Sequence, residues 1–134
     1  MDELIMAAKH ARTKAYAPYS HFNVGAAVRG ASGKIYTGSN IENASYGLTN
    51  CAERTAIFKA ISDGERVLDT IALVADSKDP VAPCGACRQV MVEFGISTII
   101  MANTSGKTHM VSMAELLPWG FEKTDLPGED KNNE

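Results

Sequence analysis

The chain has 134 residues, of which 45% are hydrophobic and 22% are charged, a composition typical of one globular domain over residues 1–134. Its formal net charge is -3, and the 13 Lys and Arg residues are scattered among 16 acids, which argues against nucleic acid as a partner. The acidic start at Asp2 and Glu3 does not resemble a signal peptide. No apolar run is long enough to cross a bilayer, so no membrane partner is expected.

The first half of the chain predicts a helix, a hairpin-like pair of strands, a loop and a second helix. Small and apolar residues at helical spacing predict both helices, and Pro18 and Gly64 end them. A run of turn-forming residues separates the two strands. The predicted ranges are 2–17 for the first helix, 22–28 and 35–39 for the strands, 40–50 for an ordered loop, and 52–62 for the second helix.

The second half predicts a strand, helix and strand in succession, an order that favours a parallel crossover. A further strand comes before the capping-box signature Ser112-Met113-Ala114-Glu115, and the polar tail from about residue 127 is expected to fray. The predicted ranges are 70–75, 85–94 and 98–102 for the crossover unit and 108–111 for the last strand. The fold class is therefore α/β, a mixed sheet with helices on its faces.

All three cysteines of the chain lie in two short motifs, Cys51-Ala52-Glu53 and Pro83-Cys84-Gly85-Ala86-Cys87. An odd number of thiols cannot all pair as disulfides, and free thiols suit a reducing cytoplasm. Both motifs lie at predicted helix starts, where the helix dipole favours thiolates. Three thiolate ligands with a fourth position left for water are typical of a catalytic zinc site, so Cys51, Cys84 and Cys87 are the predicted ligands of one Zn²⁺.

Glu53 lies two residues from the first predicted ligand and is the predicted proton carrier. Thiolate ligands beside a glutamate that does not bind the metal are the signature of zinc-dependent nucleobase deaminases. Three thiolates also weaken zinc as a Lewis acid, so a nearby cation is expected to offset their charge. Arg54 is the first candidate for this role and Arg88 is the alternative.

Other interpretations of these residues remain open in the sequence. Cys84 and Cys87 could form a thioredoxin-like redox pair, although Cys51 is then unexplained. A structural zinc site could be completed by a histidine, although none has a ligand-like spacing to a cysteine; the candidates are His10, His21 and His109. Glu53 alone could be an acid favoured by the helix dipole.

With Phe22-Asn23-Val24-Gly25-Ala26-Ala27 and Asn40-Ile41-Glu42-Asn43-Ala44-Ser45-Tyr46 added, the chain resembles the small homotetrameric zinc-dependent cytidine deaminases over about residues 4–122. The resemblance implies a three-layer α/β/α sandwich with a five-stranded mixed sheet and one zinc per subunit. It implies a cytoplasmic hydrolase of pyrimidine salvage, which converts cytidine or 2′-deoxycytidine to uridine or 2′-deoxyuridine plus ammonia. Glu53 is then the proton shuttle.

The same resemblance assigns substrate-binding roles to seven residues. Asn40 and Glu42 would hold the ribose 3′ hydroxyl, Phe22 would pack on the base, and the Ala52 backbone would read the pyrimidine edge. Ala44, Tyr46 and Phe121 would be lent to a neighbouring subunit's site in a homotetramer. Without the resemblance, Phe22 and Phe121 would be assigned to the core, and Asn40 and Glu42 to loop hydrogen bonding.

Two rival functions are consistent with the same motifs. One is a deaminase of another small aminopyrimidine, such as the blasticidin S type. The other is a zinc-binding or redox protein without turnover. The Asn40–Ala44 segment favours the nucleoside deaminase.

Overall fold

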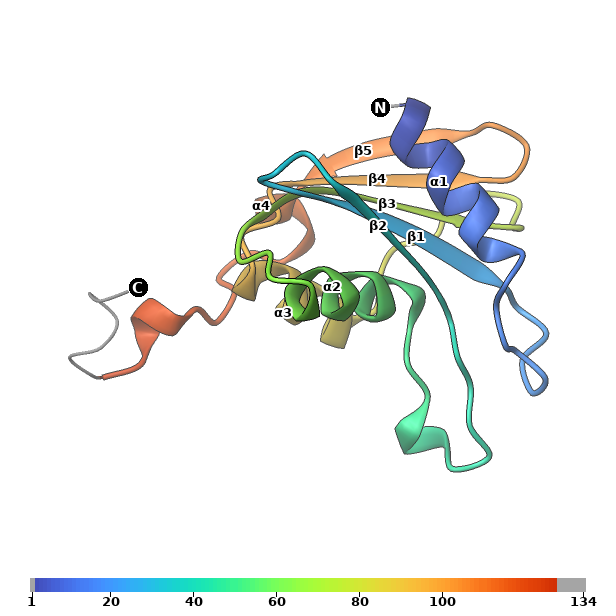
Figure 1. Cartoon of the computed structure of the whole chain (residues 1–134), viewed down its shortest axis with the longest axis horizontal. Coiled ribbons are helices and arrows are strands. Elements are labelled where there is room, and N and C mark those ends of the chain that lie inside the picture. The colour runs from blue at the N-terminus through green and yellow to red at the C-terminus, as the bar shows by residue number, and fades with distance from the viewer. Residues whose placement is uncertain (1, 128–134) are drawn as a thin grey trace.

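The computed structural model describes residues 2–127 of the chain, so most of the tail predicted from about residue 127 lies outside the described residues. Within this range the helices and strands follow closely the order that the sequence predicts (Figure 1). They are α1 (Asp2–Arg12), β1 (Val24–Gly30), β2 (Ile35–Ser39), α2 (Ala52–Ser62), β3 (Leu68–Ala75), α3 (Gly85–Glu93), β4 (Thr98–Asn103), β5 (Thr108–Ser112) and α4 (Met113–Leu116), with short 3-10 turns at Tyr46–Leu48 and Lys123–Asp125.

The sheet has five strands in the order β2-β1-β3-β4-β5. β3 and β4 run parallel, with Ile71 opposite Ile99, and the other neighbouring pairs are antiparallel. α3 makes the crossover between the two parallel strands, as the strand-helix-strand order predicts. The predicted five-stranded mixed sheet is therefore confirmed.

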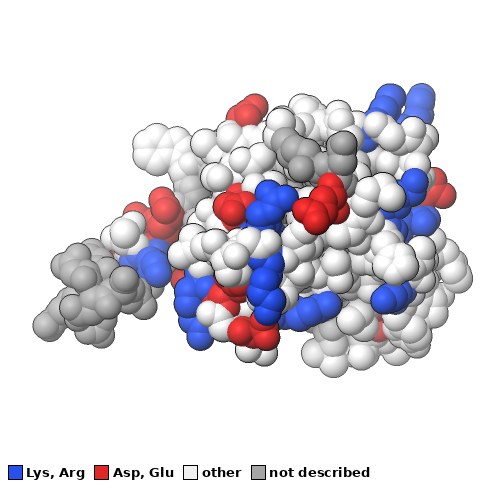
Figure 2. All heavy atoms as spheres, turned by 45° about the horizontal axis from the view of Figure 1, so that its top comes forward, with Lys and Arg blue, Asp and Glu red and all other residues white. Residues whose placement is uncertain are grey.

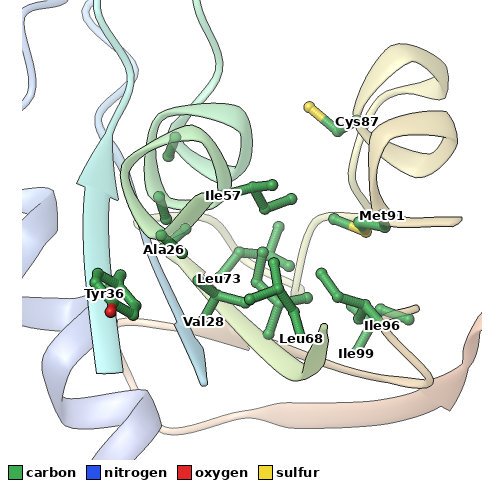
Figure 3. Close-up of a cluster of buried hydrophobic side chains, with 14 of the residues drawn as sticks. Ala26, Val28, Tyr36, Ile57, Leu68, Leu73, Cys87, Met91, Ile96 and Ile99 are labelled. Atoms are coloured by element: carbon green, nitrogen blue, oxygen red, sulfur yellow. The ribbon is translucent and has the colours of Figure 1, made fainter. Parts of the chain in front are cut away.

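Helices cover both faces of the sheet, with α1 on one face and α2 and α3 on the other (Figure 1). Beneath α1, Leu4 and Ala8 are buried in a cluster with Val74. On the opposite face a larger cluster includes Ile57 and Met91, and Figure 3 shows these side chains converging on the sheet. The α/β/α sandwich is confirmed, and the second cluster is the packed base on which α2 and α3 rest.

Two glycines allow the helices to approach the strands closely. A Cβ atom on Gly25 of β1 would lie 2.0 Å from the Ala8 carbonyl oxygen of α1. On the other face, a Cβ atom on Gly38 of β2 would lie 2.4 Å from the Ala56 nitrogen of α2. Real Cβ atoms are not found so close to backbone atoms, so any larger residue would force helix and strand apart.

The first helix is shorter than the predicted range of 2–17, because it ends at Arg12. Thr13 and Lys14 donate backbone hydrogen bonds three residues back, and the Thr13 hydroxyl donates to the His10 carbonyl. The chain then extends, and Tyr16 exchanges backbone hydrogen bonds with Asn40 and Glu42. A tertiary pairing therefore replaces the last turns of the helix, and it anchors the 40–42 segment beside the start of β1.

The other predicted boundaries are confirmed to within two residues, and the predicted ranges 35–39 and 52–62 match β2 and α2 at both ends. The first strand begins at Val24 rather than Phe22. The Asn40 side chain forms hydrogen bonds with the Phe22 carbonyl and the Val24 N–H, in place of strand pairing at these groups. The capping box at Ser112 is confirmed: its hydroxyl accepts from the Glu115 N–H, and the Glu115 carboxylate accepts from the Ser112 N–H. Over residues 2–127, none of the helices is long and apolar enough to cross a membrane.

Charged side chains of both signs are interspersed on the face shown in Figure 2, where Lys and Arg lie directly beside Asp and Glu. Three ion pairs join such groups among the described residues. This distribution matches the near balance of 13 basic and 16 acidic residues in the sequence. On the face shown, acidic side chains flank the basic ones near the centre, so positive charge is offset locally.

Candidate active site

Two of the predicted metal ligands occupy the residue just before a helix. Cys51 precedes α2 and Cys84 precedes α3, both with extended backbone angles, and neither side chain caps its helix. Their carbonyl oxygens accept the first hydrogen bonds of the helices, from Thr55 and Arg88. Both sulfurs are therefore fixed in position by a helix start yet free to bind a ligand, in the positive field of the helix dipole.

The third cysteine, Cys87, lies one turn into α3 and is fully buried. Figure 3 shows its sulfur pointing from α3 toward α2, above the hydrophobic cluster. The sulfurs of Cys84 and Cys87 are 3.3 Å apart, and those of Cys51 and Cys84 are 3.7 Å apart. The fold thus brings Cys51 next to the neighbouring pair Cys84 and Cys87, although Cys51 and Cys84 are 33 residues apart in the sequence.

The geometry of these sulfurs fits zinc. Tetrahedral coordination at about 2.3 Å per Zn–S bond places sulfurs about 3.8 Å apart, close to the distances between Cys51, Cys84 and Cys87. All three cysteines are free, so Cys84 and Cys87 do not form the disulfide of an oxidised redox pair. Among the residues described, the only metal-ligand cluster is Cys51, Cys84 and Cys87, and it includes neither Glu53 nor a histidine. Within this chain the cluster offers three donors, which leaves a fourth position of a tetrahedral ion for water.

Arg54 contacts this cluster directly, since its Nη2 atom donates a hydrogen bond of 3.5 Å to the Cys51 sulfur. Hydrogen bonds from Cys87 and Arg54 lower the pKa of the Cys51 thiol, which favours the thiolate. Arg88 instead donates to two backbone carbonyls, those of Pro83 and Leu116. Of the two candidate cations, only Arg54 has a hydrogen bond to a ligand sulfur, whereas Arg88 ties the loop before α3 to α4.

Glu53 is in the first turn of α2 but is only 4% exposed. Burial is the main cause that raises the pKa of its carboxyl to about 7, and the charge of Cys51 raises it further. An acidic side chain that served only to interact with the helix dipole would be exposed to solvent and would keep a low pKa. A buried carboxyl that titrates near neutrality can instead both accept and release a proton at working pH.

Next to the thiols and Glu53 lies a cavity of about 320 Å³. Its size is within the usual range for small-molecule sites. Thirteen residues line it: Ser20, Phe22, Val24, Asn40, Glu42, Thr49, Cys51, Ala52, Glu53, Leu73, Val81, Ala82 and Cys84. The predicted ligands Cys51 and Cys84, the predicted proton carrier and four of the seven predicted substrate-binding residues therefore share one hollow.

Asn40 and Glu42 both face this cavity and also hold the chain that enters β1. The Asn40 side chain donates to the Phe22 carbonyl at 2.8 Å and accepts from the Val24 N–H at 2.9 Å. The Glu42 carboxylate accepts from the backbone N–H groups of Tyr19 and Ser20. Loop hydrogen bonding and a place in the candidate site are thus combined in the same two side chains.

Three predicted substrate-binding residues do not line this cavity. Tyr46 is 76% exposed and Phe121 is 57% exposed, and Ala44 is also exposed. Phe22 is 39% exposed at the cavity wall, so neither Phe22 nor Phe121 is the core residue that its type alone would suggest. Ser20 is a lining residue that sequence reasoning did not single out, and only its position two residues before Phe22 could have pointed to it.

A buried glutamate beside three convergent thiols, at the helix starts of an α/β/α sandwich, defines the class of zinc-dependent hydrolytic deaminases. The model of the family described as "Cytidine and deoxycytidylate deaminase zinc-binding region" matches residues 1–103. The chain is 52% identical to a cytidine deaminase of Sporosarcina psychrophila, with 94% of each sequence covered. It is 53% identical to a cytidine deaminase of Halalkalibacterium halodurans, with 92% of this chain and 95% of the relative covered.

Solved structures agree with the sequence relatives. A crystal structure of cytidine deaminase from Burkholderia pseudomallei matches with a TM-score of 0.86 and 52% identity, covering 90% of this chain and 98% of that one. That of the Mycobacterium tuberculosis enzyme matches with a TM-score of 0.76 and 38% identity, covering 90% and 95%. The chain therefore belongs to the cytidine and deoxycytidylate deaminase zinc-binding family, as its motifs predict.

Proposed function

We propose that this protein is a cytidine deaminase of pyrimidine salvage that hydrolyses cytidine and 2′-deoxycytidine to uridine and 2′-deoxyuridine plus ammonia. The observation that carries the proposal is the convergence of the three thiols beside a cavity whose wall includes the buried Glu53. Relatives with about half of their residues identical are named as cytidine deaminases over nearly their whole length. We further propose that residues 1–134 form one catalytic domain.

Cys51, Cys84 and Cys87 would hold the ion, which fits the spacing of their sulfurs. When bound, zinc supplies a Lewis acid that makes water nucleophilic near neutral pH. Arg54 would withdraw charge from the Cys51 sulfur through its hydrogen bond, so that three thiolates do not quench this Lewis acidity.

Glu53 would move the protons of the reaction. It accepts one from water as the oxygen bonds to C4 of the pyrimidine ring, and it delivers that proton to N3. It then takes the remaining proton from the C4 hydroxyl and gives it to the amino group, so that the C–N bond breaks and ammonia leaves. The pKa of this carboxyl, raised to about 7 chiefly by burial, suits a group that must both accept and release protons near neutral pH.

The cavity wall supports a free nucleoside as substrate. Phe22 would pack on the base, the Ala52 backbone would bind the pyrimidine edge, and Asn40 and Glu42 would bind the sugar. The lining contributed by this chain contains the carboxyl groups of Glu42 and Glu53 and neither Lys nor Arg. A 5′-phosphate would gain no positive partner from this lining, which favours nucleosides over deoxycytidylate.

We also propose a cytoplasmic homotetramer in which Ala44, Tyr46 and Phe121 complete a neighbour's site. All three side chains are exposed and outside their own cavity. The cavity is also open, and enclosing a nucleoside commonly requires further walls. The three free thiols favour a reducing compartment such as the cytoplasm.

The test is side-by-side turnover by the zinc-loaded protein of cytidine, 2′-deoxycytidine, deoxycytidylate, cytosine and blasticidin S. Ammonia release and the change in ultraviolet absorbance report the reaction, and metal analysis reports zinc per subunit. We expect turnover of both nucleosides and little of the other three compounds. Full zinc occupancy without ammonia release from any of them would contradict the proposed function and favour a binding protein. Preferred turnover of blasticidin S would assign the rival deaminase.

A further inference from the structure

Ser20 connects two walls of the cavity through its hydroxyl group. This hydroxyl donates to the Glu42 Oε2 atom, and it accepts a hydrogen bond of 3.1 Å from the Phe22 N–H. The Ser20 N–H also donates to the other oxygen of Glu42, at 3.1 Å. The Ser20 side chain therefore links Glu42, whose carboxylate is proposed to bind the sugar, to the backbone of Phe22, whose ring is proposed to pack on the base.

The backbone around Ser20 is shaped for this link. His21 has a φ of 57°, in the left-handed region that is uncommon for residues other than glycine. The resulting turn brings the Phe22 N–H back to the Ser20 hydroxyl. With alanine at position 20, the Phe22 N–H and Glu42 Oε2 would each lose a partner, and the strained turn would lose a bond that supports it.

We propose that Ser20 is a positioning residue that holds Glu42 and Phe22 in the orientation that binds the nucleoside, an inference that rests on the proposed function. A carboxylate has about four acceptor sites. The Glu42 carboxylate accepts hydrogen bonds from the Tyr19 N–H and from the N–H and hydroxyl of Ser20, and these bonds fix both of its oxygens. Acceptor capacity remains for a sugar hydroxyl, with the carboxylate already in place before substrate arrives.

The chain contains a matched control for this role. The Ser32 hydroxyl donates to the carboxylate of Glu65 and accepts from the Lys34 N–H at 3.3 Å, so it has the same hydrogen-bond pattern as Ser20. Ser32 lies in the turn between β1 and β2 and does not line the cavity. A purely structural serine of this kind affects stability without affecting substrate binding.

The experiment compares Ser20→Ala, Ser20→Thr and Ser32→Ala with the parent, all zinc-loaded. Measurements are kcat and KM for cytidine and for 3′-deoxycytidine, the Kd of the product uridine by calorimetry, and thermal unfolding. For Ser20→Ala we expect the cytidine KM and the uridine Kd to rise roughly tenfold, while kcat stays within about threefold. The KM penalty should be smaller for 3′-deoxycytidine, which lacks the hydroxyl assigned to Glu42.

Ser20→Thr should restore most of the affinity, since it keeps the hydroxyl, and Ser32→Ala should bind like the parent. If the parent deaminates cytidine while Ser20→Ala retains parental KM and uridine affinity, the inference is wrong and the proposed function stands. The inference also fails if Ser32→Ala loses affinity equally. A parent that releases no ammonia contradicts the proposed function, and the uridine titration then decides alone whether Ser20 orders a nucleoside site.

Discussion

The guanidinium of Arg54 and the sulfur of Cys51 lie one helical turn apart and are joined by a hydrogen bond of 3.5 Å. Arg54 Nε is buried without a hydrogen-bond partner among the described residues, so the guanidinium is committed to the thiol cluster at the expense of one unsatisfied group. This arrangement indicates that the position of the Arg54 charge beside the Cys51 sulfur serves function rather than stability.

Arg54→Ala should therefore lower turnover of cytidine by about 10- to 100-fold while zinc occupancy falls much less. Without the arginine charge the thiolates donate more electron density to zinc, which makes the ion a weaker Lewis acid. Steady-state kinetics and metal analysis on the same preparation measure both. Arg88→Ala is the control: it removes hydrogen bonds to Pro83 and Leu116 and should mainly lower the unfolding temperature. Unchanged turnover of Arg54→Ala at full zinc occupancy would show that Arg54 does not tune the metal.

Glu53→Gln should retain zinc and fold but lose activity by a factor of about 10³, because an amide of the same size cannot carry a proton. The measurement is kcat for cytidine, with circular dichroism and zinc content as checks. Glu65→Gln, which alters a half-buried glutamate that does not line the cavity, should keep parental kcat. A rate for Glu53→Gln within tenfold of the parent would remove this residue from the proposed mechanism.

Gly25→Ala should reduce the free energy of unfolding by about 1–3 kcal/mol or more, because overpacking a rigid contact displaces backbone. The added Cβ would lie 2.0 Å from the Ala8 carbonyl, an atom that cannot swing away as a side-chain end can. Gly47→Ala is the matched change, since its Cβ would meet nothing within 4 Å. Urea denaturation of the zinc-loaded proteins compares them, and equal midpoints would contradict the close packing of α1 on β1.

Mixing two inactive variants tests the shared site. Phe121→Ala subunits keep the metal centre, whereas Glu53→Gln subunits keep Phe121, so mixed oligomers can contain a complete site that neither parent oligomer has. Activity after subunit exchange should exceed the sum of the separate variants. Light scattering should first establish the oligomer. A fully active monomer, or confirmed exchange without recovered activity, would rule out the shared site.

The order and type of the helices and strands could be predicted from the sequence because local patterns determine them. Apolar periodicity and caps located α2, α3 and the capping box at Ser112 to within a residue or two. The error at the first helix has a non-local cause: Tyr16 pairs with the chain at Asn40 and Glu42, and no local signal announces that pairing. There the hydrogen bonds of Tyr16 to a distant segment outweigh the helix propensity of residues 13–17.

In the candidate site, too, features set by local sequence patterns could be predicted, whereas those set by contacts between distant segments could not. The spacing of the cysteines around Glu53 identified the thiol cluster, because metal chemistry restricts which residues can serve. The sequence left Arg54 and Arg88 as alternatives, and only coordinates show which guanidinium reaches a sulfur. The hydrogen bonds of Asn40 to Phe22 and Val24, and the link through Ser20, join residues whose proximity depends on the folded backbone.

The separation of the thiols along the chain has a consequence for folding. Cys51 and Cys84 are 33 residues apart, and β3, the strand between them, pairs with both β1 and β4. An ion held at both positions closes this 33-residue loop, which restricts the unfolded chain much as a crosslink does. The starts of α2 and α3 then cannot open independently without releasing the metal. Backbone amides in these first turns should exchange hydrogen far more slowly in zinc-loaded protein than after chelation, while amides of α1 change little.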